Sequence, residues 1–362
     1  MGSDVACPGR REAAMRVLMI TQKIDLADPI LAFTIGWIEA LAARVDHLHV
    51  LCLECQPNAL PANVTVHSMG KEQGNSRPQE LRAFYASLRD ALPQIDVIFC
   101  HMIPRYAVLA VPLAFLYRKP LILWYVHRQI SLELRLAMSV CRFVATAVPD
   151  SFPLPTRKLR ALGHGIDAGF FAPNPSCPRD DPPLILQIAR LMPIKHQETL
   201  LRALAAGIDA KAAFVGNVPP GKSTAYRDEL HALVDELKLG KQVTFTGGLK
   251  PPAVRDLYYR ASIAVNLSPP GLFDKAALES MLCGVPTIVS NPAFDPVLGN
   301  HAPLLRIAAP DDVQGLAERL RTLLAVDESA RRAIGRDLRE RVKSAHGLDG
   351  LMDRLVALMQ EA

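Results

Sequence analysis

The segment ARLMPIKHQETLL, residues 189–201, places two cations where an apolar run gives way to a helical pattern. Arg190 ends the apolar run, and Lys195 lies just before a helix that is predicted to begin around His196. Fixed positive charge beside the backbone donors of a helix start suits a diphosphate. Arg190 and Lys195 are therefore candidate phosphate-binding residues, although two surface charges on a solvated loop are the commoner meaning of such spacing.

A second charged helix start lies in SPPGLFDKAALESMLCGVP, residues 268–286. Asp274 and Lys275 fall in its first turn, and Glu279 follows Lys275 by four residues. The apolar residues recur at helical spacing and predict a face packed on a core: Phe273, Ala277, Leu278, Met281 and Leu282. Because a helix N-terminus has unpaired N–H groups, we expect an anion there. A simple helix cap by Asp274 is the alternative.

Two glycine turns also follow apolar runs directly. GNVPPGKS begins at Gly216, and TGGL contains Gly247. Glycine lets a backbone approach a flat or charged ligand closely. Either turn alone is a weak indication of binding.

The elements around these residues alternate between short apolar runs and longer helical patterns, as in a parallel sheet covered on both faces. The rhythm breaks in the Gly-, Pro- and charge-rich segment 157–183 and then resumes. We therefore predict an α/β protein of two Rossmann-like domains facing a cleft, with ligands outside the carboxyl ends of the strands. The predicted domains are residues 1–175 and 176–340, followed by a C-terminal helix, 341–362, that packs back on the first domain.

Composition limits the classes of function. The chain has 362 residues, a formal charge of +5 and seven cysteines, an odd number that favours a reducing compartment. The N-terminus lacks the apolar core of a signal peptide, so we expect a cytoplasmic protein. The segment from Arg105 to Arg160 contains nine Lys or Arg and only two acidic residues, Glu133 and Asp150. This excess favours an anionic ligand or contact with the inner face of a membrane, with a solvated basic face as the alternative. Nucleic-acid binding lacks interleaved aromatic residues and a recognisable module.

Taken together, the motifs resemble a family 4 glycosyltransferase of the GT-B fold. The resemblance rests on ARLMPIKHQETLLRALA, FVGN, LGKQVTFTG, YYRAS and LESMLCGVPTIVS in the C-terminal half, and on RVLMITQKIDLADPILAF, HMIPRY, LWYVHRQISL and SFPLPTRKLRALGHGID in the N-terminal half. It implies a C-terminal domain that binds a nucleotide-diphosphate sugar and an N-terminal domain that binds the acceptor. No further cofactor is expected.

The resemblance also assigns roles. Arg190 and Lys195 match the pair that contacts the donor diphosphate, Glu279 matches the carboxylate that binds the ribose, and His127 matches the histidine that reaches the donor sugar. A strand-end histidine is otherwise more often structural. Gly216 and Gly247 are assigned to the donor site.

One motif departs from the family pattern. The first of two glutamates in the acidic motif is replaced by Gly271, within a Gly-x-x-Asp-Lys variant that GLFDK resembles. Asp274 then becomes the candidate for the sugar hydroxyls, and Lys275 for a phosphate or for pairing with Glu279. This departure weakens any inference about the sugar.

Mechanism and acceptor follow as expectations from the resemblance. Transfer is expected to retain anomeric configuration, and no Asp-x-Asp sequence offers ligands for a metal clamp. Asp25 and Asp28 follow the first strand and are candidates for acceptor hydroxyls, although Asp28 equally suits the cap of a helix starting at Pro29. The acceptor is a carbohydrate, a lipid-linked molecule or a natural product. A sugar-nucleotide epimerase, a phosphorylase and a catalytically silent relative remain alternatives.

Overall fold

The computed structural model describes residues 15–28 and 31–362. These residues form two compact units. The first unit holds the described residues up to Ala145, together with Pro155–Arg160 and Met352–Ala362, and the second holds Thr146–Leu154 and Ala161–Leu351. The sequence predicted that residues 161–175 belong to the first domain, whereas their contacts place them in the second unit.

The first unit is built on a seven-stranded sheet of order β3-β2-β1-β4-β5-β6-β7. Its strands are β1 (Arg16–Ile24), β2 (His47–Cys55), β3 (Val64–Ser68), β4 (Val97–His101), β5 (Leu121–Trp124), β6 (Phe143–Thr146) and β7 (Leu159–Ala161). The central strand β1 pairs in parallel with both β2 and β4. Every residue of β4 and β5 is buried, which explains their continuous apolar sequences.

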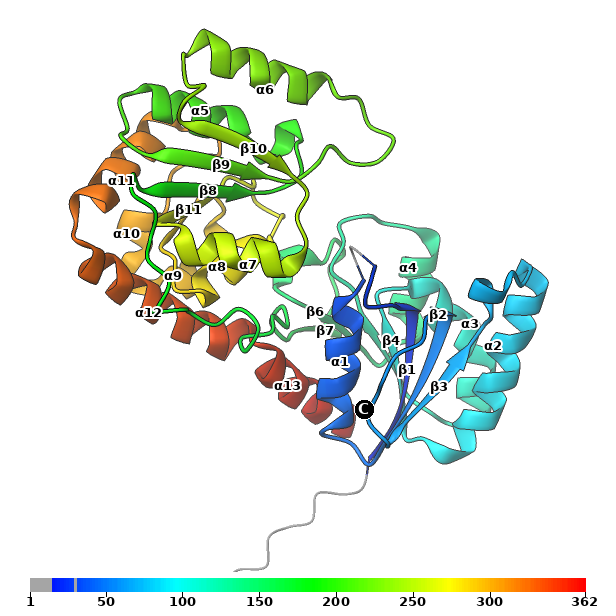
Figure 1. Ribbon diagram of the computed structural model, residues 1–362. Helices are drawn as coiled ribbons and strands as arrows, with labels where there is room; N and C mark the ends of the chain where they lie inside the picture. The colour runs from blue at the N-terminus through cyan, green and yellow to red at the C-terminus, as the bar shows by residue number, and fades with distance from the viewer. Residues whose placement is uncertain (1–14, 29–30) are drawn as a thin grey trace, which may run out of the picture. The chain divides into compact units, whose positions relative to one another are not determined.

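The helices of this unit cover both faces of the sheet. The helices between its strands are α1 (Phe33–Ala42), α2 (Arg77–Ala91), α3 (Pro104–Leu116) and α4 (Leu132–Val140). The crossover from β1 to β2 runs in the opposite direction along the sheet to those from β3 to β4 and from β4 to β5. Right-handed crossovers then place α1 on one face and α2 and α3 on the other, as Figure 1 shows.

The second unit has a five-stranded sheet of order β10-β9-β8-β11-β12, with parallel pairing throughout. Its strands are β8 (Leu184–Ile188), β9 (Lys211–Val215), β10 (Val243–Gly247), β11 (Ile263–Asn266) and β12 (Thr287–Val289). Its helices are α5 (Gln197–Ala205), α6 (Ala225–Glu236), α7 (Pro251–Arg260), α8 (Lys275–Leu282), α9 (Asp295–Leu298), α10 (Ala302–Leu305), α11 (Val313–Ala325) and α12 (Glu328–His346). Two α/β units with parallel sheets confirm the predicted fold class.

The C-terminal segment is two helices rather than the single helix predicted over 341–362. Helix α12 ends at His346, and α13 (Leu348–Gln360) begins two residues later. Ile166 bridges Gly347 between them: the Ile166 N–H donates to the His346 carbonyl at 2.9 Å, and the Leu348 N–H donates to the Ile166 carbonyl at 2.9 Å. These bonds take backbone groups that a continuous helix would use internally.

A few further elements differ from the sequence prediction. The short strands β3 and β7 were not predicted. Helix α1 is described from Phe33 onward, and the expected helix start at Pro29 lies outside the described residues. No helix in the described part of the chain combines the length and the apolar character needed to cross a bilayer.

Candidate functional site

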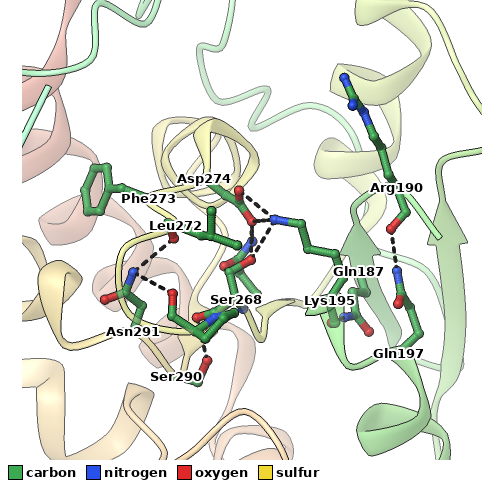
Figure 2. Close-up of polar contacts among 12 residues, drawn as sticks. Gln187, Arg190, Lys195, Gln197, Ser268, Leu272, Phe273, Asp274, Ser290 and Asn291 are labelled. Atoms are coloured by element: carbon green, nitrogen blue, oxygen red, sulfur yellow. Dashed lines mark hydrogen bonds and ion pairs between the residues drawn. The ribbon is translucent and has the colours of Figure 1, made fainter. Parts of the chain in front are cut away.

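Lys195 is the centre of a polar cluster at the carboxyl ends of β8 and β11, which are neighbours in the sheet. Its ammonium group donates to the two Asp274 carboxylate oxygens at 2.8 and 2.6 Å and to Ser268 Oγ at 3.0 Å. Asn266 donates to the same carboxylate at 3.0 Å, and the Ser268 hydroxyl also donates to it. Figure 2 shows Lys195 reaching across to Asp274 and Ser268. The structure thus joins residues from two motifs that are far apart in the sequence.

The loop that carries Lys195 is held by two buried glutamines. Gln187 donates from its side chain to the Lys195 carbonyl at 2.8 Å, and Gln197 donates to the Arg190 carbonyl at 2.9 Å. Helix α5 begins at Gln197, one residue from the predicted start, after His196 in the left-handed region at φ 51°. The backbone around both cations is therefore fixed before any ligand arrives.

The side chain of Arg190 behaves differently. It is exposed, and in Figure 2 its guanidinium points away from Asp274. The residues that the structure describes give it no ion pair. Arg190 is thus available to an incoming anion, whereas Lys195 is already engaged.

The loop before α8 is anchored from the next strand end. Asn291 donates to the carbonyls of Pro269 and Leu272 at 3.3 and 2.9 Å, and the Ser290 hydroxyl donates to the Ser268 carbonyl at 3.0 Å. Figure 2 shows these contacts on the far side of the loop from Lys195. Gly271 adopts φ 87° within this loop, a backbone conformation that glycine allows.

Asp274 occupies the N-cap position of α8, but its side chain makes no hydrogen bond to the helix backbone. The alternative that Asp274 serves simply as a cap is therefore wrong, because its carboxylate is held by Lys195, Ser268 and Asn266. The predicted apolar face is confirmed by the buried side chains of Phe273, Ala277, Leu278, Met281 and Leu282.

Lys275 and Glu279 lie one turn apart on α8 and are both half-buried. Desolvation raises the pKa of Glu279 above its ordinary value, while the charge of Lys275 opposes this rise. Desolvation likewise lowers the pKa of Lys275. The electrostatic coupling agrees with the predicted pairing. The ribose-binding role of Glu279 stays a prediction.

The two glycine turns line one hollow with a volume of about 500 Å³. It lies at the carboxyl ends of β9 and β10, where the Gly216 N–H donates to the Gly247 carbonyl at 2.9 Å. The size suits a small flat ligand. The lining residues are Leu191, Gly216, Asn217, Val218, Arg227, His231, Phe245 and Gly247.

Gly216 is required by the fold itself. It adopts φ 145°, and a Cβ there would overlap the Ala189 carbonyl oxygen. The close approach that the sequence indicated is thus to the chain's own backbone. Arg227 and His231 were missed as lining residues. Their spacing of four on α6 was the available signal, and His231 packs on Phe245 with ring centroids 4.5 Å apart.

The remaining predicted residues belong to the first unit. Asp25 and Asp28 follow β1, and Lys23 joins them: its ammonium lies 3.0 Å from Asp25, 3.2 Å from Asp28 and 3.1 Å from Glu54. Hydrogen bonding to Ala27 and Lys23 lowers the pKa of Asp25. Asp28 accepts from the Leu31 N–H at 2.8 Å, just before α1 begins. Neither Lys23 nor Glu54 was predicted to take part.

His127 lies on an exposed loop after β5, with its ring centroid 5.7 Å from that of Tyr125. Its contact with a donor sugar stays a prediction, which the described contacts do not test. Within residues 15–28 and 31–362, no group of three or more His, Cys, Asp or Glu is arranged to hold a metal ion.

Comparison with known proteins bears on the second unit most directly. Residues 172–340 match the family model described as Glycosyl transferases group 1. D-inositol 3-phosphate glycosyltransferase from Mycobacterium avium (strain 104) is 29% identical over 156 residues, which are 43% of this chain and 37% of that protein. GDP-mannose-dependent alpha-(1-6)-phosphatidylinositol dimannoside mannosyltransferase from Mycobacterium tuberculosis is 28% identical over 185 residues, 48% of this chain and 45% of that protein. The chain therefore spans less than half the length of these curated relatives.

Solved structures are similar over nearly the whole chain. Sucrose-phosphate synthase from Thermosynechococcus elongatus has a TM-score of 0.72 at 20% identity, covering 96% of this chain and 98% of that one. Anabaena HepE in complex with UDP has a TM-score of 0.72 at 19% identity, covering 96% and 100%. Identity this low shows a shared fold. The chain has the predicted GT-B fold, and its residues 172–340 are similar to the glycosyl transferases group 1 family.

Proposed function

We propose that this protein is a glycosyltransferase that moves a sugar from a nucleotide-diphosphate sugar to an acceptor, with retention and without a metal ion. The observation that carries the proposal is the Lys195 ammonium group at the carboxyl ends of β8 and β11, held by Asp274 and Ser268. It lies within the segment that matches the family model. A fixed cation at the carboxyl ends of parallel strands suits a diphosphate.

The reaction requires stabilisation of negative charge. Breaking the bond between the anomeric carbon and the diphosphate oxygen leaves charge on the diphosphate, and fixed donors are the largest source of stabilisation. Lys195 and Arg190 supply positive charge, and the first N–H groups of α8 supply backbone donors that Asp274 does not cap. The three ammonium hydrogens of Lys195 already serve three acceptor atoms. A bound diphosphate must therefore replace at least one of them.

The other candidates take positions around this centre. Asp274 orients Lys195 and accepts hydrogen bonds from the sugar hydroxyls in place of the glutamate that Gly271 replaces. Glu279 binds the ribose, and Lys275 sets its charge state. The hollow at Gly216 and Gly247 receives the base. His127 is the further candidate for contact with the donor sugar.

Retention is proposed through a front-face reaction, in which the leaving diphosphate oxygen helps to remove the acceptor proton. Such a reaction needs no carboxylate nucleophile, and Gly271 provides no carboxylate at the position where the family usually has one. The new glycosidic bond then forms on the same face of the sugar that the diphosphate leaves.

The acceptor is proposed to be a hydroxyl compound bound near Asp25 and Asp28. The names of the two curated relatives refer to inositol 3-phosphate and to a phosphatidylinositol dimannoside. These names support an anionic carbohydrate or a lipid-linked acceptor here, and with it a cytoplasmic protein in peripheral contact with a membrane.

The test is a transfer assay with the full chain. UDP-, GDP-, ADP- and TDP-sugars are each incubated with inositol phosphates and with lipid extracts, and products are detected by mass spectrometry. One donor should give a product heavier by one sugar, made by the wild type and by Lys241→Ala but not by Lys195→Ala. Lys241 serves as the control because it is exposed and lies just before β10, at the amino ends of the strands of the same sheet.

The alternatives give different results. An epimerase would convert the nucleotide sugar with no acceptor present, and a silent relative would bind a nucleotide without turnover. Inverted configuration at the anomeric carbon of the product, determined by NMR, would overturn retention while leaving transfer intact.

A further inference from the structure

A second cavity lies in the first unit, at the amino ends of the sheet strands. His127 instead follows the carboxyl end of β5. The cavity has a volume of about 790 Å³ and is formed where α3 ends and where β5, β6 and β7 begin. Its lining includes Leu121 and Phe143, the first residues of β5 and β6. Asp25, Asp28 and His127 follow the carboxyl ends of their strands instead. This basic groove is therefore separate from the residues assigned to transfer.

The lining of the basic groove combines two kinds of side chain. Five of its thirteen residues are cations and none is acidic: Lys119, Arg142, Arg157, Lys158 and Arg160. Its floor and walls are apolar: Val111, Ala114, Phe115, Leu121, Val140 and Phe143. Among the described residues, none of the five cations forms an ion pair with a carboxylate. The groove therefore lacks an anion that would balance its charge.

Two of the five cations lie over one aromatic ring. The guanidinium carbons of Arg142 and Arg160 lie 5.5 and 4.9 Å from the centroid of Phe143. Lys158 is occupied differently, since its ammonium donates to the carbonyls of Met138, Ser139 and Cys141 at the end of α4. Arg142 and Arg157 are exposed, and neither forms an ion pair with a described carboxylate. Guanidinium groups in such a position bind phosphate oxygens well.

Exposed apolar residues continue the groove onto the surface. Phe115 and Leu116, at the end of α3, are 84% and 71% exposed. On α4, Leu132, Leu136 and Val140 recur every four residues on the outward side and are 70%, 45% and 42% exposed. The other side of α4 already packs inward through Leu134 and Ala137. The outward stripe is therefore not needed for the core of this unit.

We propose that the basic groove and this stripe bind anionic phospholipid in a bilayer, with an acyl chain against the apolar lining and the phosphate at Arg142, Arg157 and Arg160. A bilayer is favoured because it offers phosphate and hydrocarbon together, whereas a soluble phosphate would leave the apolar residues uncovered. Aromatic and leucine side chains beside Lys and Arg are typical of surfaces that lie in a membrane interface. The proposal does not depend on the transfer reaction.

The experiment is flotation of the full chain with vesicles of phosphatidylcholine alone or mixed with phosphatidylglycerol. Wild type should float with the mixed vesicles and much less with the neutral ones. The pair Arg142→Gln/Arg157→Gln should lower the partition coefficient by about ten- to thirtyfold, since each Lys or Arg near an anionic surface contributes roughly a fivefold factor. Phe115→Ser/Leu116→Ser should also lower it, and it tests the apolar part without changing charge.

The matched control is Arg77→Gln/Arg82→Gln, which removes two exposed charges from α2 in the same unit. It should bind as the wild type does. Equal loss by the control pair would mean general charge attraction and would overturn the proposal, as would unchanged binding by both groove variants. If the groove variants lost binding to a single-stranded polynucleotide and kept their vesicle binding, the groove would instead be a nucleic-acid surface. Melting temperatures of all variants, with and without the donor nucleotide, separate these results from unfolding and from failure of the donor site.

Discussion

The ammonium group of Lys195 lies 2.8 and 2.6 Å from the two carboxylate oxygens of Asp274, a residue 79 positions later in the chain. The two side chains are only 14% and 24% exposed. The pair joins the loop after β8 to the start of α8. It places a cation, which a diphosphate would require, beside a hydrogen-bond acceptor, which a sugar hydroxyl would require.

Asp274→Asn separates these two roles. The change removes the negative charge that competes with a diphosphate for Lys195, so a free nucleoside diphosphate should bind at least as tightly as to the wild type. The sugar-linked nucleotide should bind more weakly, because the amide accepts fewer hydrogen bonds than the carboxylate. Calorimetric titration with both ligands measures the difference. A parallel loss for both would mean that Asp274 acts only on the diphosphate.

The same substitution should lower the free energy of unfolding of the ligand-free protein by about 1–2 kcal/mol, since the pair is partly buried and only partly screened. Denaturant titration of the wild type and of Asp274→Asn checks this value. No change in stability would indicate that the pair is loosely held in solution.

His164 should make the second unit sensitive to acid. Its ring is buried, Nε2 lies 3.3 Å from the Phe273 carbonyl, and desolvation lowers the pKa from 6.5 to about 3. Below pH 6.5 the unfolded chain binds a proton that the folded chain does not. Stability is therefore complete above this pH and falls as the pH drops towards 3. The loss over the first two pH units of this fall should be about 2–3 kcal/mol.

His164→Gln keeps a side-chain donor and cannot titrate, so its stability should depend less steeply on pH over this interval. Chemical denaturation at several pH values gives the slope for each protein. Identical slopes would show that His164 does not carry the acid sensitivity.

Gly216→Ala tests whether the glycine serves the fold before it serves a ligand. A methyl group at φ 145° would overlap the Ala189 carbonyl oxygen, and neither backbone can move independently of its strand. The substitution should cost at least about 2 kcal/mol. Gly240→Ala is the control, because its Cβ meets nothing within 4 Å, and it should change stability by less than about 1 kcal/mol. Similar melting temperatures for both variants would mean that this close approach matters little to the fold.

The sequence predicted the elements better than the contacts between them. Apolar runs were sufficient to predict strands such as β4 and β8, because buried parallel strands need continuous hydrophobic sequence. The pairing of Lys195 with Asp274 could not be predicted, since it depends on β8 and β11 being neighbours in the sheet. The break at Gly347 depends on a bridge to Ile166, which the local helical pattern does not reveal.

Lys23→Met tests the cluster at the end of β1. Lys23 is the shared partner of Asp25, Asp28 and Glu54, and these interactions raise its pKa above the ordinary value for lysine. Without the cation, the three carboxylates repel one another when ionised. The variant should melt at a lower temperature than the wild type, by a larger margin at neutral pH than in mild acid, where the carboxylates can take up protons. A margin that does not vary with pH would argue against this cluster.

The central claim is that Lys195 binds the diphosphate of a nucleotide sugar. The direct measurement is the thermal shift of the wild type, Lys195→Ala and Lys241→Ala with UDP, GDP, ADP and TDP, free and sugar-linked. One nucleotide at about a hundred times its Kd should raise the Tm of the wild type and of Lys241→Ala by about 2–4 °C and leave Lys195→Ala unchanged. An equal shift in Lys195→Ala, or no shift with any nucleotide, would contradict this claim.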